Sequence, residues 1–366
     1  MSSVLYSDPK LESIKEKVHR GERLMFDDGV RLFESNDIVT LGQLALFAKE
    51  RTAGKSVYFS NNLYINPTNI CDVGCYFCAF ARKENAPDAY TLSLDEIKQR
   101  VRKAVDLYQV REVHIVGGLY EKLSFDYFAD LISVIKEVDP ALFVKAYTAV
   151  EVDFLARMGN LSIQDCLLEL KRRGLNSMPG GGAEILGERV RKKICPQKIT
   201  GGEWLDIHRQ AHRIDLVTNA TMLYGHVEEN EDRVEHMLML RTLQDETNGF
   251  RSFVPLAFHP KNTKLDHISP TDGMLDLKMF AVSRLLLDNI PHIKAYWTTL
   301  GMKTAQVSLF FGVDDFAGTN ISEKIMHDAG AESPVETTRR EIVRLVRDAG
   351  FEPVEVDSSY TTQYTY

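Results

Sequence analysis

The chain has 366 residues, of which 44% are hydrophobic and 26% are charged, proportions that are ordinary for a globular protein. The formal net charge is −8 and no long run of Lys or Arg occurs, so the sequence argues against a nucleic-acid partner. No stretch approaches the roughly 18 consecutive apolar residues of a membrane span, and the N-terminal residues lack an apolar signal core. We therefore expect a cytoplasmic protein without a membrane partner.

Short helices are predicted at the N-terminal end of the chain. A helical period of apolar residues runs over 11–20 and stops at Gly21, a residue typical of helix C-caps. Two further helices are expected over 26–35 and 41–54. Residues 1–50 therefore predict an N-terminal helical extension.

From residue 56 onward, predicted strands alternate with predicted helices. Residues 304–312 fit either a strand or a buried helix. We expect strands over 56–67, 111–118, 142–148, 175–182, 216–225, 253–260, 290–297 and 351–360. We expect helices over 92–108, 125–138, 162–174, 185–194, 202–214, 231–246, 275–288 and 336–350.

This order of elements predicts the fold class. Repeated β-then-α units form a parallel sheet with helices outside it. About seven or eight such units favour a closed barrel over an open sheet. No linker rich in Pro, Gly or Ser interrupts them. We therefore predict an α/β protein with a TIM-like (β/α)8-type barrel over residues 51–366, which includes a C-terminal helix and strand addition.

Three of the five cysteines, Cys71, Cys75 and Cys78, have the spacing C-x3-C-x2-C just after the first predicted barrel strand. Thiolates are soft ligands that suit iron–sulfur clusters and zinc. The same spacing also marks one face of a helix, so three core cysteines are an alternative. Turn-forming residues around them, among them Pro67 and Gly74, favour a metal-binding loop.

Structural zinc is the second alternative, and it nearly always takes four protein ligands. No fourth Cys or His lies close by, since the nearest, His114, falls in a predicted strand well downstream. A cluster held by three thiolates keeps one iron free for a further ligand. We therefore favour a four-iron four-sulfur cluster, and we expect Cys166 and Cys195 to be packed thiols outside it.

The sequence from Cys71 to Cys78, with Phe77 before the third cysteine, resembles the signature of the radical S-adenosylmethionine (SAM) superfamily. The resemblance implies that the free iron binds the amino and carboxylate groups of S-adenosylmethionine. It also implies that an electron from the cluster breaks the sulfur–C5′ bond, which gives methionine and a 5′-deoxyadenosyl radical. We expect Phe77 and the edge formed by Gly117 and Gly118 to lie beside this co-substrate.

A run of three glycines is a further candidate for binding the co-substrate. Gly180, Gly181 and Gly182 precede a predicted helix, where free backbone N–H groups suit a carboxylate. A flexible connection is the alternative.

Polar residues at other predicted strand ends complete the candidate co-substrate site. Thr148 and Glu151 are candidates for contacts with the ribose or the methionine amine. Glu151 fits equally well as a charge at a helix N-terminus. Asn219 and Met222 are candidates to border the adenine, although Met222 also fits the core.

Longer segments together resemble one branch of this superfamily, among them NATMLYGH, FVPLAFHPKNT and the closing FGVDDFAGT. The branch contains the aminofutalosine synthases, the cyclic dehypoxanthinyl futalosine synthases and the deazaflavin (F420-type) synthases. Residues 256–260 and 292–297 are most similar to the aminofutalosine synthase family of menaquinone biosynthesis.

This resemblance implies a transferase reaction on 3-[(1-carboxyvinyl)oxy]benzoate. The adenosyl radical would add through C5′ to the enolpyruvyl double bond, and the radical would then rearrange onto the ring and lose the carboxylate. The products would be 6-amino-6-deoxyfutalosine and methionine, with an electron donor such as flavodoxin or ferredoxin. Because the substrate carries two carboxylates, we expect His259, Lys294 and His226 at the strand ends to be catalytic residues.

Two other functions compete with this interpretation. In the cyclising futalosine enzyme, the adenosyl radical abstracts hydrogen and leaves as free 5′-deoxyadenosine, so the product distinguishes the two. The other alternative, from a different class, is a non-catalytic zinc or iron–sulfur scaffold protein, which the iron content of anaerobically purified protein would test.

Overall fold

The computed structural model describes residues 8–366, and the first seven residues of the predicted N-terminal extension lie outside this range. The predicted N-terminal helices form. Gly21 ends the first of them in the left-handed region, at φ 71°. They are α1 (Glu12–Arg20), α2 (Phe26–Glu34) and α3 (Ile38–Ala53), preceded by the 3-10 turn η1 (Pro9–Leu11).

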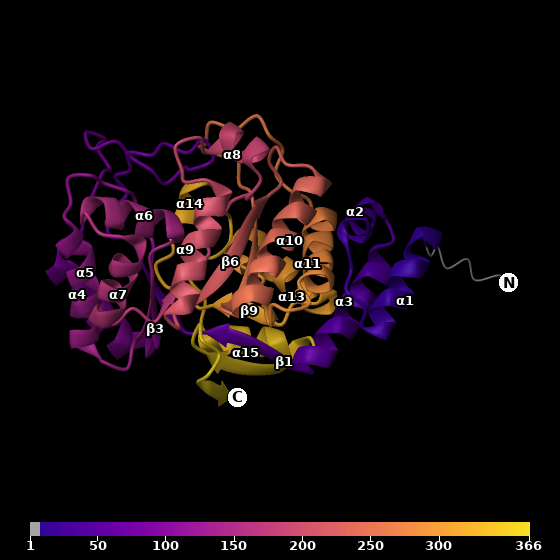
Figure 1. The fold of residues 1–366 in the computed structure, drawn as a ribbon. Helices are drawn as coiled ribbons and strands as arrows, with labels where there is room; N and C mark the ends of the chain where they lie inside the picture. The colour runs from indigo at the N-terminus through magenta and orange to yellow at the C-terminus, as the bar shows by residue number, and fades with distance from the viewer. Residues whose placement is uncertain (1–7) are drawn as a thin grey trace.

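A curled seven-stranded sheet forms the centre of the molecule (Figure 1), and its strands are parallel and adjacent in chain order. The row that joins Tyr64, His114, Lys145 and Ser177 across neighbouring strands fixes the register of its first half. The strands are β2 (Asn62–Ile65), β3 (Glu112–Ile115), β4 (Phe143–Ala146), β5 (Ser177–Met178), β6 (Val217–Tyr224), β7 (Phe250–Ala257) and β8 (His292–Ile293).

Residues 314–321 take the eighth place between β8 and β2. On one side, the backbone N–H of Ala295 donates to the carbonyl of Asp315 (2.8 Å). On the other side, the N–H of Ile321 donates to the carbonyl of Asn62 (3.1 Å). The predicted α/β barrel is thus confirmed, with seven strands in one sheet and a less regular segment beside them.

Helices cover the outside of the barrel, as the alternating pattern predicts. Ser93 begins α4 with a capping box to Glu96, and Gly174 ends α7 in the left-handed region. Among these covering helices, α6 was not predicted; Thr148 begins it with a capping box to Glu151. The helices are α4 (Leu94–Tyr108), α5 (Phe125–Val138), α6 (Ala149–Met158), α7 (Ile163–Arg173), α8 (Glu188–Ile194), α9 (Gly201–Arg213), α10 (Asn230–Thr247) and α11 (Gly273–Leu286).

The N-terminal helices lie against this outer layer, with α2 and α3 packed on α10 and α11 at the right of Figure 1. The division of the chain into an extension and a barrel at residue 50 remains a prediction.

The expectation of one strand over 56–67 is wrong, because the segment divides at Asn61. The Asn61 amide donates to the carbonyls of Tyr108 and Gln109, which anchors the bend at the end of α4. Residues before the bend join a second sheet of order β11-β10-β1-β9, drawn below the barrel in Figure 1. Its strands are β1 (Ser56–Ser60), β9 (Asp315–Gly318), β10 (Glu352–Val356) and β11 (Gln363–Thr365).

The segment 304–312, for which the sequence left two possibilities, is helical. It follows α12 (Trp297–Leu300) and forms α13 (Met302–Ser308) and the 3-10 turn η2 (Leu309–Phe311), with Val307 and Phe310 exposed. The remaining helices are α14 (Ile325–Asp328) and α15 (Arg339–Asp348).

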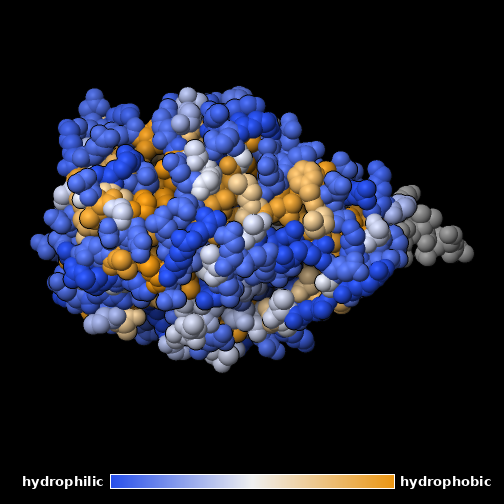
Figure 2. Space-filling view, viewed as in Figure 1, coloured by the Kyte–Doolittle hydropathy of each residue, from blue (hydrophilic) through white to orange (hydrophobic). Residues whose placement is uncertain are grey.

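The molecular surface seen in Figure 2 is mostly hydrophilic, and hydrophobic residues form patches among the hydrophilic ones. Among residues 8–366, no helix combines the length and the hydropathy needed to cross a membrane.

Candidate active site

The three clustered cysteines lie in a loop between β2 and α4, and not on a helix. The backbone of this loop is anchored on its neighbours. The N–H of Cys71 donates to the carbonyl of Arg82 (3.1 Å), and the N–H of Tyr76 donates to the carbonyl of Ile194 (2.9 Å). Gly74 adopts a left-handed φ of 72° at the turn. The predicted loop, which suits a cluster better than a helix would, is therefore present.

Cys71, Cys75 and Cys78 are free and half-buried thiols. Burial raises the pKa of Cys75 to about 12 and also raises the pKa of Cys78, whereas the charge of Lys198 opposes both shifts. Within residues 8–366, no group of three or more His, Cys, Asp and Glu side chains could hold a single metal ion. In a four-iron four-sulfur cluster each thiolate binds a different iron, so the three sulfurs need not meet at one point.

The edge formed by Gly117 and Gly118 packs directly on the cysteine loop. The N–H of Gly118 donates to the carbonyl of Thr68 (2.8 Å), and no side chain fits at Gly118. The N–H of Gly117 donates to the Glu151 carboxylate (3.0 Å), whose other oxygen accepts from the N–H of Thr148 (2.7 Å). Burial raises the pKa of Glu151 despite these bonds. Both Glu151 oxygens are thus used to join the glycine edge to the start of α6.

The helix predicted to follow the three glycines begins three residues later than expected. Helix α8 begins at Glu188, so residues 183–187 separate Gly182 from it. Gly180 instead packs against the backbone of Asn219 and Ala220 on β6, where a side chain would not fit. Residues 180–182 nevertheless line the central cavity of the barrel.

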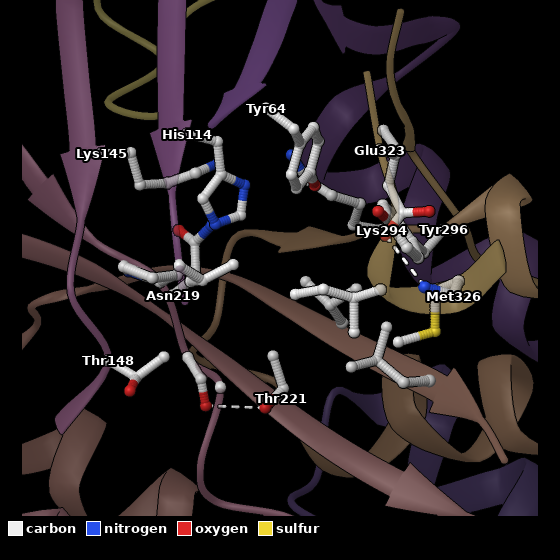
Figure 3. Close-up of a pocket in the computed structure, with 18 of the residues that line it drawn as sticks. Tyr64, His114, Lys145, Thr148, Asn219, Thr221, Lys294, Tyr296, Glu323 and Met326 are labelled. Carbon is white, nitrogen blue, oxygen red and sulfur yellow. Dashed lines mark hydrogen bonds between the residues drawn. The ribbon is translucent and has the colours of Figure 1, made fainter. Parts of the chain in front are cut away.

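This cavity has a volume of about 260 Å³ and lies inside the barrel. Figure 3 shows His114 and Lys145 at one end and Thr148 and Thr221 at the other. The first end is called the floor here, and it consists of His114, Lys145 and Lys294. The walls between the two ends include the apolar side chains of Val116, Val254, Leu256, Ile325 and Met326.

Two buried ion pairs hold the lysines of the floor. Lys145 Nζ lies 2.8 Å from a carboxylate oxygen of Glu112, and Lys294 Nζ lies 3.2 Å from one of Asp315. Burial opposes ionisation of Glu112, but the attraction of Lys145 outweighs it and lowers the pKa of this carboxyl. For Asp315, burial outweighs the attraction of Lys294, so its pKa is raised. Burial also lowers the pKa of Lys145, so the floor presents to the cavity two lysines that are each paired with a buried carboxylate.

His114 is the least satisfied group of the floor. Both ring nitrogens are buried and have no hydrogen-bond partner among the described residues. Burial, together with Lys145 and Lys294, holds the pKa of His114 well below its ordinary value, so the ring is neutral. The ring packs on Tyr64 with 4.5 Å between the ring centroids.

A second lysine pair connects the cavity with the cysteine loop. Lys198 Nζ lies 2.5 Å from a Glu184 oxygen and 5.0 Å from the centre of the Phe77 ring. Both Lys198 and Glu184 line the cavity. The half-buried Phe77 thus lies in the cysteine loop beside this charged wall, and its contact with the co-substrate stays a prediction.

Several predicted site residues lie outside the cavity lining. His226 Nε2 bonds the carbonyl of Leu223 (3.0 Å), and its Nδ1 accepts from the N–H of Val227 (2.7 Å) and lies 3.0 Å from a Glu228 oxygen. His259 Nε2 bonds the carbonyl of Thr299 (2.9 Å). Their catalytic roles remain predictions. Met222 is fully buried in the core, the alternative that its sequence context also allowed. The predicted residues that do line the cavity are Thr148, Gly180, Gly181, Gly182, Asn219 and Lys294.

Sequence reasoning missed other residues of the cavity. The missed signal was a polar residue in an apolar strand: His114 in REVHIVGG and Lys145 in LFVKAYT. Because alternate residues of a barrel strand point inward, such residues must lie in the interior. Glu184 and Tyr296 follow strands in irregular segments and Lys198 follows α8, so none of the three carried a comparable signal.

Comparison with known proteins agrees with this geometry. The pattern of the radical SAM superfamily matches residues 65–240, and that of the CofH/MqnC C-terminal region matches residues 247–365. An aminodeoxyfutalosine synthase of Thermus thermophilus is 46% identical over 359 residues, which cover 96% of each chain. A 5-amino-6-(D-ribitylamino)uracil--L-tyrosine 4-hydroxyphenyl transferase of Methanopyrus kandleri is 39% identical and covers 87% of this chain and 88% of its own.

A solved structure supports the fold. Methylornithine synthase superposes with a TM-score of 0.74 over 94% of this chain and 98% of its own, at 18% identity, which shows a shared fold alone. The fold, the cysteine loop and the full-length sequence matches agree. The chain therefore belongs to the aminodeoxyfutalosine synthase family of radical SAM enzymes.

Proposed function

We propose that the chain is a transferase that adds the adenosyl group of S-adenosylmethionine to 3-[(1-carboxyvinyl)oxy]benzoate. The observation that carries this proposal is the 46% identity to an aminodeoxyfutalosine synthase over 96% of both chains. The products would be 6-amino-6-deoxyfutalosine, methionine and the released carboxylate. A cavity of cationic floor and apolar walls supports it, because the substrate joins an aromatic ring to two carboxylates.

Cys71, Cys75 and Cys78 are the residues that would hold the cluster. Three soft thiols in one loop fit a four-iron four-sulfur cluster with one open iron. When bound, the cluster supplies the electron that cleaves S-adenosylmethionine. The close packing of Gly118 on the loop supports this assignment, because it holds the loop in one conformation next to the cavity.

The co-substrate would lie between the cysteine loop and the cavity. Phe77, Gly117 and Gly118 would bound it on the loop side. Thr148, Asn219 and the glycines 180–182 would bound it on the cavity side. Glu151 would act through the glycine edge that it anchors.

The protein's own residues would then orient the substrate and exclude water. The enolpyruvyl group must face the co-substrate, because the new bond forms to C5′. The apolar walls would surround the aromatic ring and shield reactive intermediates from solvent. Lys294 is the predicted catalytic residue that lies in the floor, where it can bind a carboxylate. A cytoplasmic electron donor such as flavodoxin or ferredoxin would supply the electron that the reaction requires.

A second candidate function comes from the relatives named as 4-hydroxyphenyl transferases. Anaerobic turnover with S-adenosylmethionine distinguishes the two. One reaction contains the enolpyruvyl benzoate, and the other contains tyrosine with 5-amino-6-(D-ribitylamino)uracil. Our proposal requires an adenosyl-containing product in the first mixture and no consumption of tyrosine in the second. Consumption of tyrosine alone would establish the second candidate.

A further inference from the structure

We infer that the floor of the cavity, formed by His114, Lys145 and Lys294, is a carboxylate-binding subsite that holds the benzoate end of the substrate. The inference deepens the proposed function and rests on it for the identity of the substrate. It adds two residues, His114 and Lys145, that neither the cysteine motif nor the strand-end pattern indicates.

The position of these residues in the sheet is the first argument. Tyr64, His114, Lys145 and Ser177 are paired in register on four adjacent strands, so they form one row on the inner surface of the barrel. In (β/α)8 barrels such rows are normally filled by bulky branched apolar side chains. Here the row is polar throughout, which costs stability unless the polar groups find partners.

The second argument is a count of hydrogen-bond donors. An ammonium group has three N–H donors. Lys145 Nζ forms an ion pair with Glu112 and a hydrogen bond with Ser358, each at 2.8 Å, which leaves one donor unused within residues 8–366. In the part of the chain that the structure describes, Lys294 Nζ has one ion-pair partner, Asp315. Neutral His114 adds one ring N–H, and none of its nitrogens has a partner among the described residues. Unused donors thus gather at one end of one cavity.

A group with several acceptor oxygens and a negative charge satisfies these donors, and a carboxylate is the group of this kind on the substrate. The benzoate carboxylate is the one that reaches the floor, because the enolpyruvyl group must face the opposite end. Figure 3 shows this separation, with His114 and Lys145 remote from Thr148 and Thr221. The apolar walls between the two ends suit the benzene ring.

If His114 had a purely structural role, we would expect its ring nitrogens to have hydrogen-bond partners. His236, on α10, is a buried histidine of this structural kind. Its Nδ1 accepts from the N–H of Leu186 (3.1 Å), and its Nε2 bonds the carbonyl of Thr221 (3.0 Å). His114 makes neither type of bond. Replacing it by a ring of similar shape should therefore cost little stability, whereas the same change at His236 should be costly.

The test compares binding of two probes to the anaerobically reconstituted holoenzyme with S-adenosylmethionine and no reductant. The probes are 3-methoxybenzoate and its uncharged isostere 3-methoxybenzamide, titrated by calorimetry. The wild-type protein should bind the acid about 10- to 100-fold more tightly, the range for hydrogen bonds to a charged group. In His114→Phe this preference should fall to a few-fold, while the exposed control His19→Phe should retain it.

Lys145→Gln is the second variant, and it should also weaken the preference for the acid. Thermal unfolding accompanies each titration. His114→Phe should melt within a few degrees of wild type, and His236→Phe should melt clearly lower. If His114→Phe does not fold, the preference of Lys145→Gln for the acid over the amide tests the subsite by itself.

The subsite is refuted if the wild-type protein does not prefer the acid, or if both variants keep the full preference. Turnover of the enolpyruvyl benzoate is measured separately on the wild-type protein. Acid preference without an adenosyl-containing product would overturn the proposed function and leave the subsite standing. Product formation with an unchanged preference in both variants would overturn the subsite and leave the proposed function standing.

Discussion

A β-carbon placed on Gly118 would lie 2.0 Å from the carbonyl oxygen of Ile70, the residue just before the first cysteine of the loop. The backbone of the strand end and that of the cysteine loop therefore touch without an intervening side chain. This contact fixes the distance between the end of β3 and the loop that would hold the cluster.

Gly118→Ala should displace the cysteine loop and reduce cluster incorporation. The added methyl group overlaps backbone atoms, which cannot move aside as a flexible side chain can. We expect bound iron and the visible absorbance of the reconstituted protein to fall to less than about half of wild type. Gly273→Ala is the control, because a β-carbon at Gly273 meets no atom within 4 Å. Full iron content in Gly118→Ala would contradict the role of this contact.

Cys71→Ala, Cys75→Ala and Cys78→Ala should each abolish cleavage of S-adenosylmethionine. Each thiolate would hold a different iron, so two thiolates cannot keep the cluster in place. Iron analysis and reductive cleavage to methionine measure the effect. Cys166→Ala should retain both properties, because Cys166 is a fully buried core residue of α7. Normal cleavage in any of the first three variants would show that its cysteine is not a ligand.

The buried pair of Lys145 and Glu112 should show strong coupling in unfolding experiments. Lys145→Met leaves the Glu112 carboxylate without its cation and should lower the free energy of unfolding by about 3–5 kcal/mol. In the double variant with Glu112→Gln, the loss should be smaller than the sum of the single losses by at least about 1 kcal/mol. Urea denaturation measures all three.

The exposed pair of Lys98 and Glu137 is the control for this cycle. Its side chains remain partly in solvent, so the coupling should be below about 1 kcal/mol. Additive losses for Lys145 and Glu112 would show that the two charges do not stabilise each other in the barrel.

Glu228 should make the protein sensitive to acid. Burial raises the pKa of its carboxyl, but His226 and Arg233 outweigh this and lower the pKa to about 2. A carboxyl with a lowered folded-state pKa stabilises the fold above its unfolded pKa, and this contribution is lost as the pH falls toward the folded value. Between about pH 6 and about pH 3.5, wild type should therefore lose on the order of 1 kcal/mol more than Glu228→Gln. Equal losses in urea denaturation would contradict the pairing.

The helices of the barrel could largely be predicted from sequence because their ends are set locally. Ser93 with Glu96, and Gly174, are capping residues whose effect depends on a few neighbours. The division of 56–67 at Asn61 could not be predicted in this way. Residues on both sides are buried, and β1 leaves the barrel because it pairs with β10, whose residues lie almost 300 positions later.

The site shows the same contrast between local and distant causes. The cysteine loop could be predicted from spacing and turn residues that are adjacent in the chain. The floor of the cavity depends on partners far apart in sequence, such as Lys145 and Ser358. The glycines 180–182 line the cavity, although the helix that follows them begins three residues later than expected. Their place is determined by packing on β6, which composition does not reveal.

The fate of the adenosyl group tests the central claim most directly. Turnover with S-adenosylmethionine labelled with carbon-13 at C5′ is followed by NMR of the purified product. The proposed function predicts that the labelled carbon is bonded to a carbon from the enolpyruvyl benzoate, with one methionine formed per product. Recovery of all the label as free 5′-deoxyadenosine would contradict it and would favour a hydrogen-abstracting enzyme.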